Sequence, residues 1–505
     1  MIEHTENRDL ITNPSYKNIM RLSWPTMISY IALLTVSIVD LYFVGDLGRS
    51  AIAAVSIGGT VWWLLMNFLD GLRQATTILV AGFVGEGQDK KSGLVLNLSL
   101  AIAGIISLIL FFSADALSDF LHGIMTSDPA IVLLGRSYLP ILLKGSFATL
   151  MFFSIEGFFR GLGNTFLPML ISGVVCVVNI FFNWTIVAGH MGFTKMGVKG
   201  AAMSTVCAEC IGLLIGVCSI LTDKSARKVI SKQFARGSAM FEFLKISLEV
   251  GFFALSISAA RCIFTAFIGR ADTLLLAAHQ IANQVFSILF LPSLAFMISA
   301  SIIASALVSS NQLDLLTTAV RRILVICMLT MLCFGGLIWF YAESLALAFS
   351  PTDLAVAKIA SKAIKLVVID QVICAFSLVL RGVLAGVGMA GYTMVVAFFS
   401  SVVIFLPLAW LVIFQFKLGL LGGYIAMIFW TLLSTALFSY RYFWTVANSE
   451  RFSAFLKKTQ GEPGGVEQDF AGMTGVCNPA EVAENSEIGI LSEDEESSEA
   501  DQREE

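Results

Sequence analysis

Twelve long apolar stretches constrain this chain more than any other feature of its sequence. Each is near or above the length of about 20 residues that a helix needs to cross a bilayer. The composition agrees, because 57% of the 505 residues are hydrophobic and only 13% are charged. We therefore predict an all-α polytopic membrane protein with twelve transmembrane helices. The stretches cover residues 22–44, 54–84, 94–114, 130–157, 166–189, 199–221, 244–268, 276–308, 323–342, 359–382, 394–416 and 419–444.

The basic residues predict the orientation of these helices. Twelve is an even number, so both ends of the chain lie on the same side of the membrane. Segments on that side carry eighteen Lys or Arg, and those on the other side carry seven. Because cytoplasmic segments are enriched in Lys and Arg, we expect both termini in the cytoplasm. We expect contact with membrane lipid and no nucleic-acid partner.

The chain also contains an internal repeat of six stretches. Motifs of the first half recur in the same order in the second, at offsets of 222 to 225 residues. Both halves then enter the membrane from the same side, as parallel repeats around a central cleft. This arrangement is typical of transporters. The recurring positions are Phe43, Gly45, Ala53, Ala54 and Ile57 with Phe267, Gly269, Ala277, Ala278 and Ile281; Gly157, Gly161, Gly163 and Met169 with Gly382, Gly386, Gly388 and Met394; and Lys195, Gly197 and Gly200 with Lys417, Gly419 and Gly422.

The repeat and the charge distribution predict five parts of the chain. They are a cytoplasmic N-terminal segment (1–21), an amino-terminal six-helix lobe (22–221), a cytoplasmic basic linker (222–243), a carboxy-terminal six-helix lobe (244–444) and a cytoplasmic acidic tail (445–505). The last 45 residues hold fourteen acidic residues and one Arg. Such a segment buries too little apolar area to fold, so we predict that the tail is disordered.

Polar side chains inside the apolar stretches are the candidate functional residues. Asp40 lies in the first stretch, where a carboxylate must be paired, hydrated or protonated. It is either part of a functional site or an interfacial side chain near the end of its helix. Asn179 and Asn183 lie four residues apart and project from one helix face. They either serve a site or hydrogen-bond neighbouring helices within the lobe.

Other charged residues leave the charge of a ligand open. Asp70 and Arg73 can pair on one helix face, and Asp370 lies in the tenth stretch. Acids in a cleft would suit cationic ligands, whereas Arg73, Lys144 and Arg261 would suit anionic or zwitterionic ones. The four histidines are scattered. Cys207 and Cys210 have the spacing of a metal or redox motif, but they lie within an apolar stretch with no second cysteine pair and no histidine in register. We therefore expect no enzyme activity, no cofactor and no metal centre built on histidine or cysteine.

A series of motifs in fixed order resembles the multidrug and toxic compound extrusion (MATE) family. The resemblance covers residues 14–448, and no single motif in it is specific. The motifs are Pro25 with Asp40, Phe43–Gly48, Ala51–Val55, Arg160–Pro168, Ala277–Ile281, Leu380–Gly388 and Leu406–Leu408.

The resemblance implies a cation-coupled antiporter built as a V-shaped pair of six-helix lobes. In the branch that this chain resembles, a carboxylate on the first helix works with polar residues of the fifth and sixth, which here are Asp40, Asn179, Asn183 and Thr205. Many relatives carry an aspartate where this chain has Asn183, so Asp40 would be a single coupling acid. Asp370, Asp70 and Arg73 are secondary candidates.

The resemblance implies export of small amphipathic organic compounds, or drugs, by alternating access, driven by proton or sodium entry. If the coupling ion is sodium, we expect it at Asp40, and we expect no other metal. The motifs look bacterial and no cleavable signal pattern precedes the first stretch, so we expect the protein in the cell inner membrane. We also expect a monomer. The alternative is a flippase or exporter of lipid-linked saccharides from the same superfamily. That protein would need a larger, more basic cleft and usually more than twelve spans.

Overall fold

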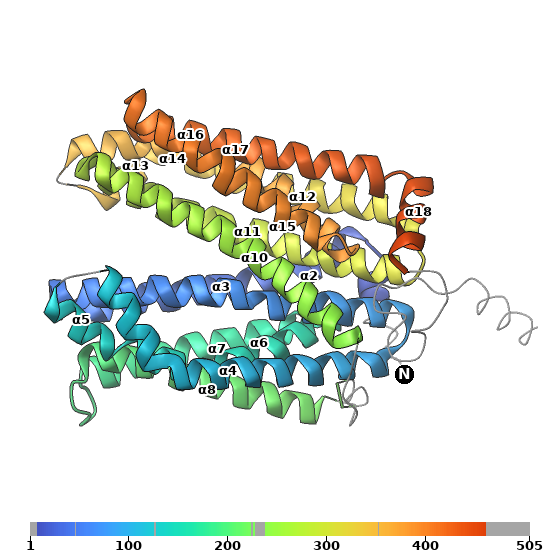
Figure 1. Cartoon of the computed structure of the whole chain (residues 1–505), viewed down its shortest axis with the longest axis horizontal. Helices are drawn as coiled ribbons and strands as arrows, with labels where there is room; N and C mark the ends of the chain where they lie inside the picture. The colour runs from blue at the N-terminus through green and yellow to red at the C-terminus, as the bar shows by residue number, and fades with distance from the viewer. Residues whose placement is uncertain are drawn as a thin grey trace, which may run out of the picture.

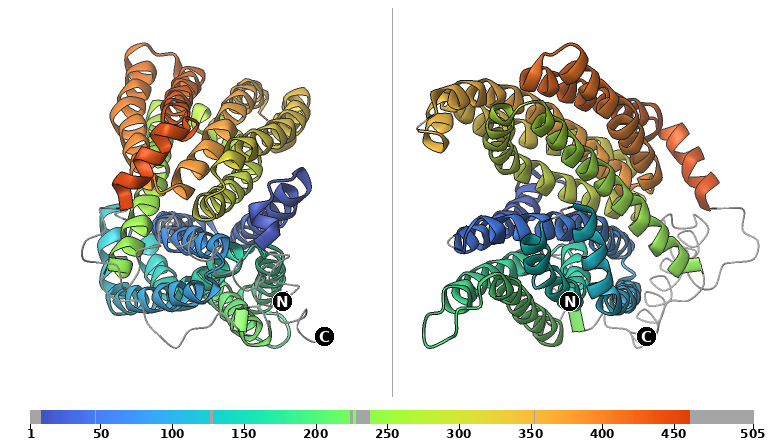
Figure 2. Two further views of the ribbon diagram at one scale, coloured as in Figure 1. Left: turned by 90° about the vertical axis from the view of Figure 1, so that its right-hand side faces the viewer. Right: turned by 60° about the vertical axis from the view of Figure 1, so that its left-hand side comes forward.

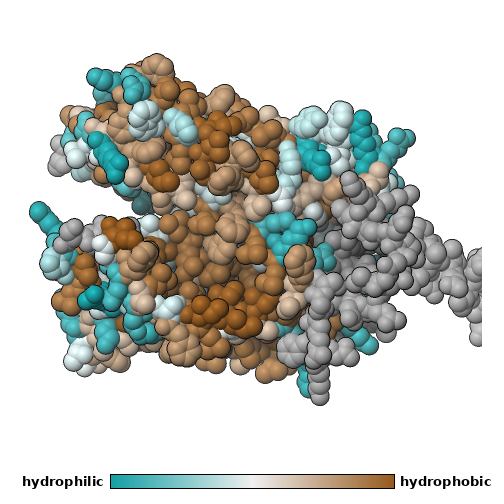
Figure 3. All heavy atoms as spheres, in the orientation of Figure 1, coloured by the Kyte–Doolittle hydropathy of each residue, from teal (hydrophilic) through white to brown (hydrophobic). Residues whose placement is uncertain are grey.

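The computed structural model describes residues 8–45, 47–125, 128–223, 226–227, 238–351 and 353–460. Within these residues, twelve helical segments are long and apolar enough to cross a membrane, which confirms the predicted spans. An apolar surface covers the middle of the molecule, and polar residues gather at its two ends (Figure 3). The helices of the first half are α2 (Tyr16–Gly45), α3 (Arg49–Glu86), α4 (Asp89–Met125), α5 (Pro129–Arg136), α6 (Leu139–Gly161), α7 (Phe166–Phe182), η1 (Asn183–Val187) and α8 (Gly197–Thr222).

The second half repeats this order of spans with more interruptions. Its eleventh span contains two π-helical segments, η2 and η3, on either side of the short helix α16 that holds Pro407. The elements are α10 (Ser238–Ala271), α11 (Thr273–Ser309), α12 (Leu313–Phe340), α13 (Ala342–Phe349), α14 (Leu354–Gly386), α15 (Ala390–Phe398), η2 (Phe399–Phe405), α16 (Leu406–Trp410), η3 (Leu411–Gln415), α17 (Gly419–Arg441), η4 (Tyr442–Val446) and α18 (Ser449–Gln460).

The helices form two lobes (Figure 1). The amino-terminal lobe contains α2 to α8, and the carboxy-terminal lobe contains α10 to α17. Helix α3 packs against α10 and α11, and α2 packs against α11. Two further views show the lobes diverging from this contact (Figure 2). The predicted V-shaped pair of lobes is therefore present.

Glycines of the internal repeat make equivalent close contacts in the two lobes. A Cβ atom on Gly157 of α6 would lie 2.5 Å from the carbonyl oxygen of Arg73 on α3. A Cβ on Gly382 of α14 would lie 2.2 Å from the carbonyl oxygen of Met297 on α11. Only glycine lets two helix backbones approach this closely. The repeated glycines thus have the same packing role in both halves.

The burial of α3 and α11 shows where the lobes separate. Residues 75–85 of α3 and residues 295–309 of α11 are all buried, whereas Trp63 and Ile288, earlier in the two helices, are 48% and 52% exposed. The lobes are therefore in contact at one end, the closed end, and parted at the other, the open end (Figure 3). The start of α2 and helix α18 both lie at the closed end (Figure 1).

Three predicted boundaries differ from the structure. Helix α2 begins at Tyr16, inside the predicted N-terminal segment, and α10 begins at Ser238, inside the predicted linker. The prediction of disorder from residue 445 onwards is wrong for 449–460, which form α18. This helix is stable because Phe452 and Leu456, four residues apart, are buried on one face. The acidic residues 461–505 and linker residues 228–237 lie outside the described residues.

Candidate functional site

Four polar side chains, with Asp40 at their centre as one of them, meet inside the amino-terminal lobe. Asn183 Nδ2 donates a hydrogen bond to Asp40 Oδ1 at 2.6 Å, and Thr205 Oγ1 donates to Asp40 Oδ2 at 3.2 Å. Asn179 Nδ2 donates to Thr205 Oγ1 at 3.4 Å, and Asn183 Nδ2 also reaches Asn179 Oδ1 at 3.0 Å. Both asparagines are fully buried, whereas Asp40 is partly exposed. The structure thus brings together all four residues named from the sequence, from α2, α7, η1 and α8.

The local helix geometry positions the two amides. Helix α7 ends at Phe182, and Asn183 is the first residue of the π-helical turn η1. Such wider turns occur often at functional sites, because they move a side chain out of the regular helical register. Asn179 and Asn183 still share one face, four residues apart. That face is turned toward Asp40 on α2 and Thr205 on α8.

Two residues near Asp40 were not among the candidates named from the sequence, although Glu209 is a charged residue inside an apolar stretch. Glu209 lies one helical turn beyond Thr205, and its carboxylate accepts a hydrogen bond from the Thr149 hydroxyl. Tyr138 is buried at the break between α5 and α6, just before Pro140, and is close enough to Asp40 to interact electrostatically. A second carboxylate, that of Glu209, therefore lies near Asp40 in this lobe. The spacing of Thr205 and Glu209 on one helix face was the available signal.

Asp70 and Arg73 lie in a separate buried ion network on α3 and α6. Arg73 Nη2 lies 2.5 Å from Asp70 Oδ1, which confirms their predicted pairing. Arg73 Nη1 also lies 2.7 Å from Glu156 Oε2, and Glu156 Oε1 lies 2.5 Å from Arg160 Nη2. The side chains of Arg73, Glu156 and Arg160 are at most 5% exposed. Two carboxylates and two guanidinium groups thus neutralise one another where the lobes close.

Arg381 connects this network to the carboxy-terminal lobe. Its Nη1 donates hydrogen bonds to Gln74 Oε1 and Met297 Sδ, both at 3.0 Å. Its guanidinium lies 4.0 Å from the centre of the Phe253 ring. Gln74 in turn donates to Asp70 Oδ2 at 2.8 Å. A hydrogen-bonded chain therefore crosses from one lobe to the other.

Asp370 lies in the carboxy-terminal lobe, apart from the Asp40 site. Thr431 Oγ1 donates to its Oδ1 at 2.6 Å, and Gln371 Nε2 donates to its Oδ2 at 3.0 Å. The side chain is 2% exposed. The structure does not bring Asp370 together with the other candidates, so the sequence-predicted residues fall into three separate groups.

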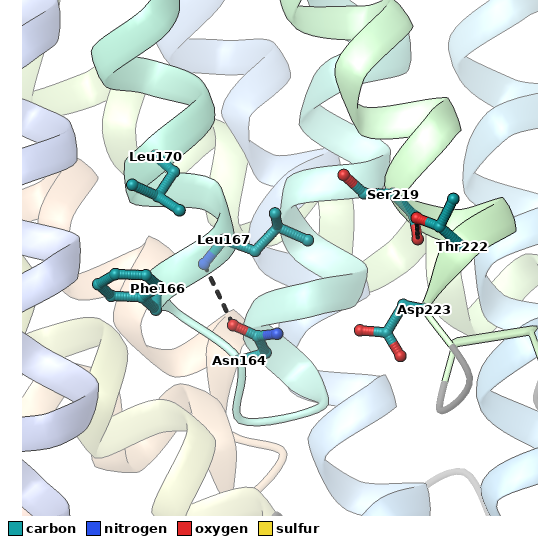
Figure 4. Close-up of a pocket in the computed structure, with 7 residues that line it drawn as sticks. All are labelled: Asn164, Phe166, Leu167, Leu170, Ser219, Thr222 and Asp223. Carbon is teal, nitrogen blue, oxygen red and sulfur yellow. Dashed lines mark hydrogen bonds between the residues drawn. The ribbon is translucent and has the colours of Figure 1, made fainter.

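A shallow pocket of about 320 Å³ lies near the closed end, between α7 and α8. None of the candidate residues lines it (Figure 4). Asn164 Oδ1 accepts a hydrogen bond from Leu167 N at 3.1 Å there, which holds the start of α7. The lining residues are Asn164, Phe166, Leu167, Leu170, Ser219, Thr222 and Asp223.

Comparison with known families identifies the fold. The MatE family model matches the chain twice, over residues 25–185 and 251–411. The chain belongs to the MatE family. The two matches begin 226 residues apart, so each covers one copy of the internal repeat. Members of the family are membrane transporters, and this chain is accordingly a transporter and not an enzyme.

Bacterial relatives of this MatE protein cover most of its length. A probable multidrug resistance protein NorM from Thermotoga maritima is 24% identical over 415 residues, which are 82% of this chain and 89% of that protein. One from Agrobacterium fabrum is 27% identical over 417 residues, covering 80% of this chain and 88% of the relative.

Solved structures share the fold. An outward-facing multidrug resistance MATE family transporter of the MOP superfamily superposes with a TM-score of 0.81 at 20% identity, covering 90% of this chain and 99% of that one. A MOP superfamily transporter from Pyrococcus furiosus, described as having a binding pocket of reverse polarity, gives a TM-score of 0.78 at 21% identity with the same coverage.

Proposed function

We propose that this MatE protein is a cation-coupled antiporter that exports small amphipathic organic compounds, including drugs, across a bacterial inner membrane. The observation that carries the proposal is the hydrogen-bonded group of Asp40, Asn183 and Thr205, which joins three helices of one lobe. The multidrug resistance function in the names of the NorM relatives supports the substrate class.

Asp40 is the coupling acid in this proposal. Both of its oxygens accept hydrogen bonds from Asn183 and Thr205, which suits the charged form of a carboxylate. A protonated carboxyl group must instead donate one hydrogen bond. Asn183 Oδ1 is buried and has no hydrogen-bond partner, so an acceptor is available beside it. Binding a proton would therefore rearrange the contacts that hold α2 against η1 and α8.

Sodium is the other candidate coupling ion at this position. Hard cations prefer oxygen ligands, and the Asp40 carboxylate, Asn183 Oδ1 and Thr205 Oγ1 offer three of them. Either ion would add a positive charge beside Asp40. A coupled ion can drive transport only if it binds the two conformations of the protein unequally.

Alternating access would exchange the closed and open ends of the cleft. The excess of Lys and Arg at the closed end, where α2 starts and α18 lies, supports a cytoplasmic position for that end and for both termini. The lobes are then parted toward the outside. The protein would work as a monomer, because each chain contains both lobes of the cleft.

Export of a fluorescent cationic dye from proteoliposomes tests the proposal. A proton gradient or a sodium gradient is imposed on vesicles that contain the wild type, Asp40→Asn or Asp115→Asn. Asp115 is an exposed acid that pairs with Lys144, so its variant is the matched control. We expect one gradient to drive export by the wild type and the control, and Asp40→Asn to bind the dye without exporting it.

Two results would contradict the proposal. Normal export by Asp40→Asn would show that the coupling acid lies elsewhere. Export that neither gradient accelerates would show that the transporter is not coupled to these ions.

A further inference from the structure

Arg261 projects from α10 into the interior of the carboxy-terminal lobe. Its Nη2 donates a hydrogen bond to Asn283 Oδ1 on α11 at 2.6 Å, and its guanidinium lies 3.3 Å from the centre of the Phe286 ring. Asp370 of α14 and Tyr424 of α17 are close enough to act on it electrostatically. The charge therefore lies among four helices of the lobe and not on the lipid-facing surface.

No ion pair within the described residues neutralises this guanidinium. In the described part of the chain, ion pairs within 4.0 Å join Arg73 and Arg160 to Glu156 and Lys144 to Asp115, but none involves Arg261. The oxygens of Asp370 accept hydrogen bonds from the neutral donors Thr431 and Gln371. A cation inside a protein without an ion-pair partner is unfavourable, so an arriving anion would be stabilised at this position.

Arg261 is partly exposed, whereas Arg381 at the lobe contact is buried. Arg381 is 1% exposed, and its Nε and Nη2 are sealed from solvent without partners. Arg261, Asn283 and Phe286 are all partly exposed, and none of the Arg261 nitrogens is both buried and unpartnered. Its remaining N–H groups are therefore not sealed from solvent. Arg261 lies on α10 and Asn283 on α11, the two helices of this lobe that pack against α3 of the other lobe.

An aromatic wall adjoins the charge. The rings of Phe286 and Phe290, one turn apart on α11, are stacked with centroids 5.3 Å apart and planes 21° from parallel. Both side chains are partly exposed. A flat apolar ring system placed against these rings would bring a substituent within reach of the guanidinium.

The geometry points to Arg261 as the residue that binds the carboxylate of a planar aromatic substrate in the transport cleft. A guanidinium can donate two parallel hydrogen bonds to a carboxylate, which makes such a contact strong and directional. Asp40 in the opposite lobe would tolerate a cationic group on the same molecule, so aromatic zwitterions belong to the class. This inference rests on the proposed function and names the substrate chemistry of the same cleft.

A matched pair of dyes tests the inference: a rhodamine with a free carboxylate and its methyl ester. Their binding to purified protein in detergent is measured by fluorescence anisotropy for the wild type, Arg261→Gln, Arg261→Lys and Arg270→Gln. Arg270 is an exposed arginine near the end of the same helix and serves as the control. We expect Arg261→Gln to weaken binding of the acid at least about tenfold and binding of the ester less than about twofold. Arg261→Lys should retain part of the affinity for the acid, and Arg270→Gln should change neither dye.

Unchanged binding of the acid by Arg261→Gln would overturn the inference. Equal weakening of both dyes by Arg261→Lys, which keeps the charge, would also overturn it, because it would indicate a structural role. The binding assay needs no gradient, so it separates the two proposals. If binding of the acid depends on Arg261 but neither gradient drives export of either dye, only the proposed antiport is contradicted. If only the ester is exported, and Arg261→Gln does not change its export, only the assignment of the substrate class is contradicted.

Discussion

Glu156 and Arg381 occupy corresponding positions of the two repeats, 225 residues apart, yet they carry opposite charges. Glu156 pairs with Arg73 inside the amino-terminal lobe. The repeat places Met297 opposite Arg381, and the sulfur of a methionine cannot neutralise a guanidinium. Arg381 therefore hydrogen-bonds Gln74 of the other lobe. The change of charge at one repeated position has replaced an ion pair within a lobe by a contact between lobes.

Replacing Arg381 by Met should weaken lobe closure without unfolding the protein. The substitution removes the contact to Gln74 and also removes a buried charge that has no carboxylate partner, so thermal stability should be equal or higher. Spin labels at Thr222 and Tyr440, both exposed, report the separation of the lobes at the closed end. We expect the Arg381→Met variant to have a larger fraction of molecules in which the two labels are far apart. Arg441→Met, away from the lobe contact, is the control, and the same distances in both variants would refute the role of Arg381.

Glu156→Gln should destabilise the protein strongly. The carboxylate lies between two buried guanidinium groups, and its loss leaves both without their shared counter-charge. Removing one partner of a buried pair costs about 3 to 5 kcal/mol. Asp115→Asn removes the partner of Lys144 at an exposed position and should cost at most about 1 kcal/mol. Thermal unfolding in detergent compares the two, and similar melting temperatures would contradict the central role of Glu156.

Gly71→Ala should separate α3 from α10. A Cβ atom on Gly71 would lie 2.1 Å from the backbone oxygen of Ser247, and neither backbone can yield without moving its helix. We expect loss of transport together with a lower melting temperature. Gly59→Ala on the same helix meets no atom within 4 Å and should leave both unchanged or raise stability slightly. Full transport by Gly71→Ala would show that the lobes do not depend on this crossing.

Thr205→Val should impair coupled export, whereas Thr205→Ser should retain it. Valine keeps the shape of threonine but removes the hydroxyl group that donates to Asp40 and accepts from Asn179. The two variants separate the hydrogen bond from the packing. Gradient-driven dye export measured for both should differ several-fold. Equal rates would mean that the hydroxyl has no part in coupling.

The sequence by itself determined the number of spans, the six-helix repeat and three of the residues around Asp40. Hydropathy and repeat spacing can be read from the amino-acid sequence without any knowledge of the packing. Asn179 and Asn183 could be placed on one face because four residues make about one helical turn. The family pattern then joined them to Asp40 and Thr205, and the structure placed the four together.

Only the tertiary structure decided which charged side chains are neutralised. Arg73, Arg261 and Arg381 all lie inside apolar stretches and look alike in the sequence. In the folded protein, the first pairs with Glu156, the second hydrogen-bonds Asn283 within its own lobe, and the third contacts Gln74 of the other lobe. These differences depend on the rotation of each helix about its axis and on the distances between helices. Both are set by packing across the whole bundle, which no local pattern of residues records.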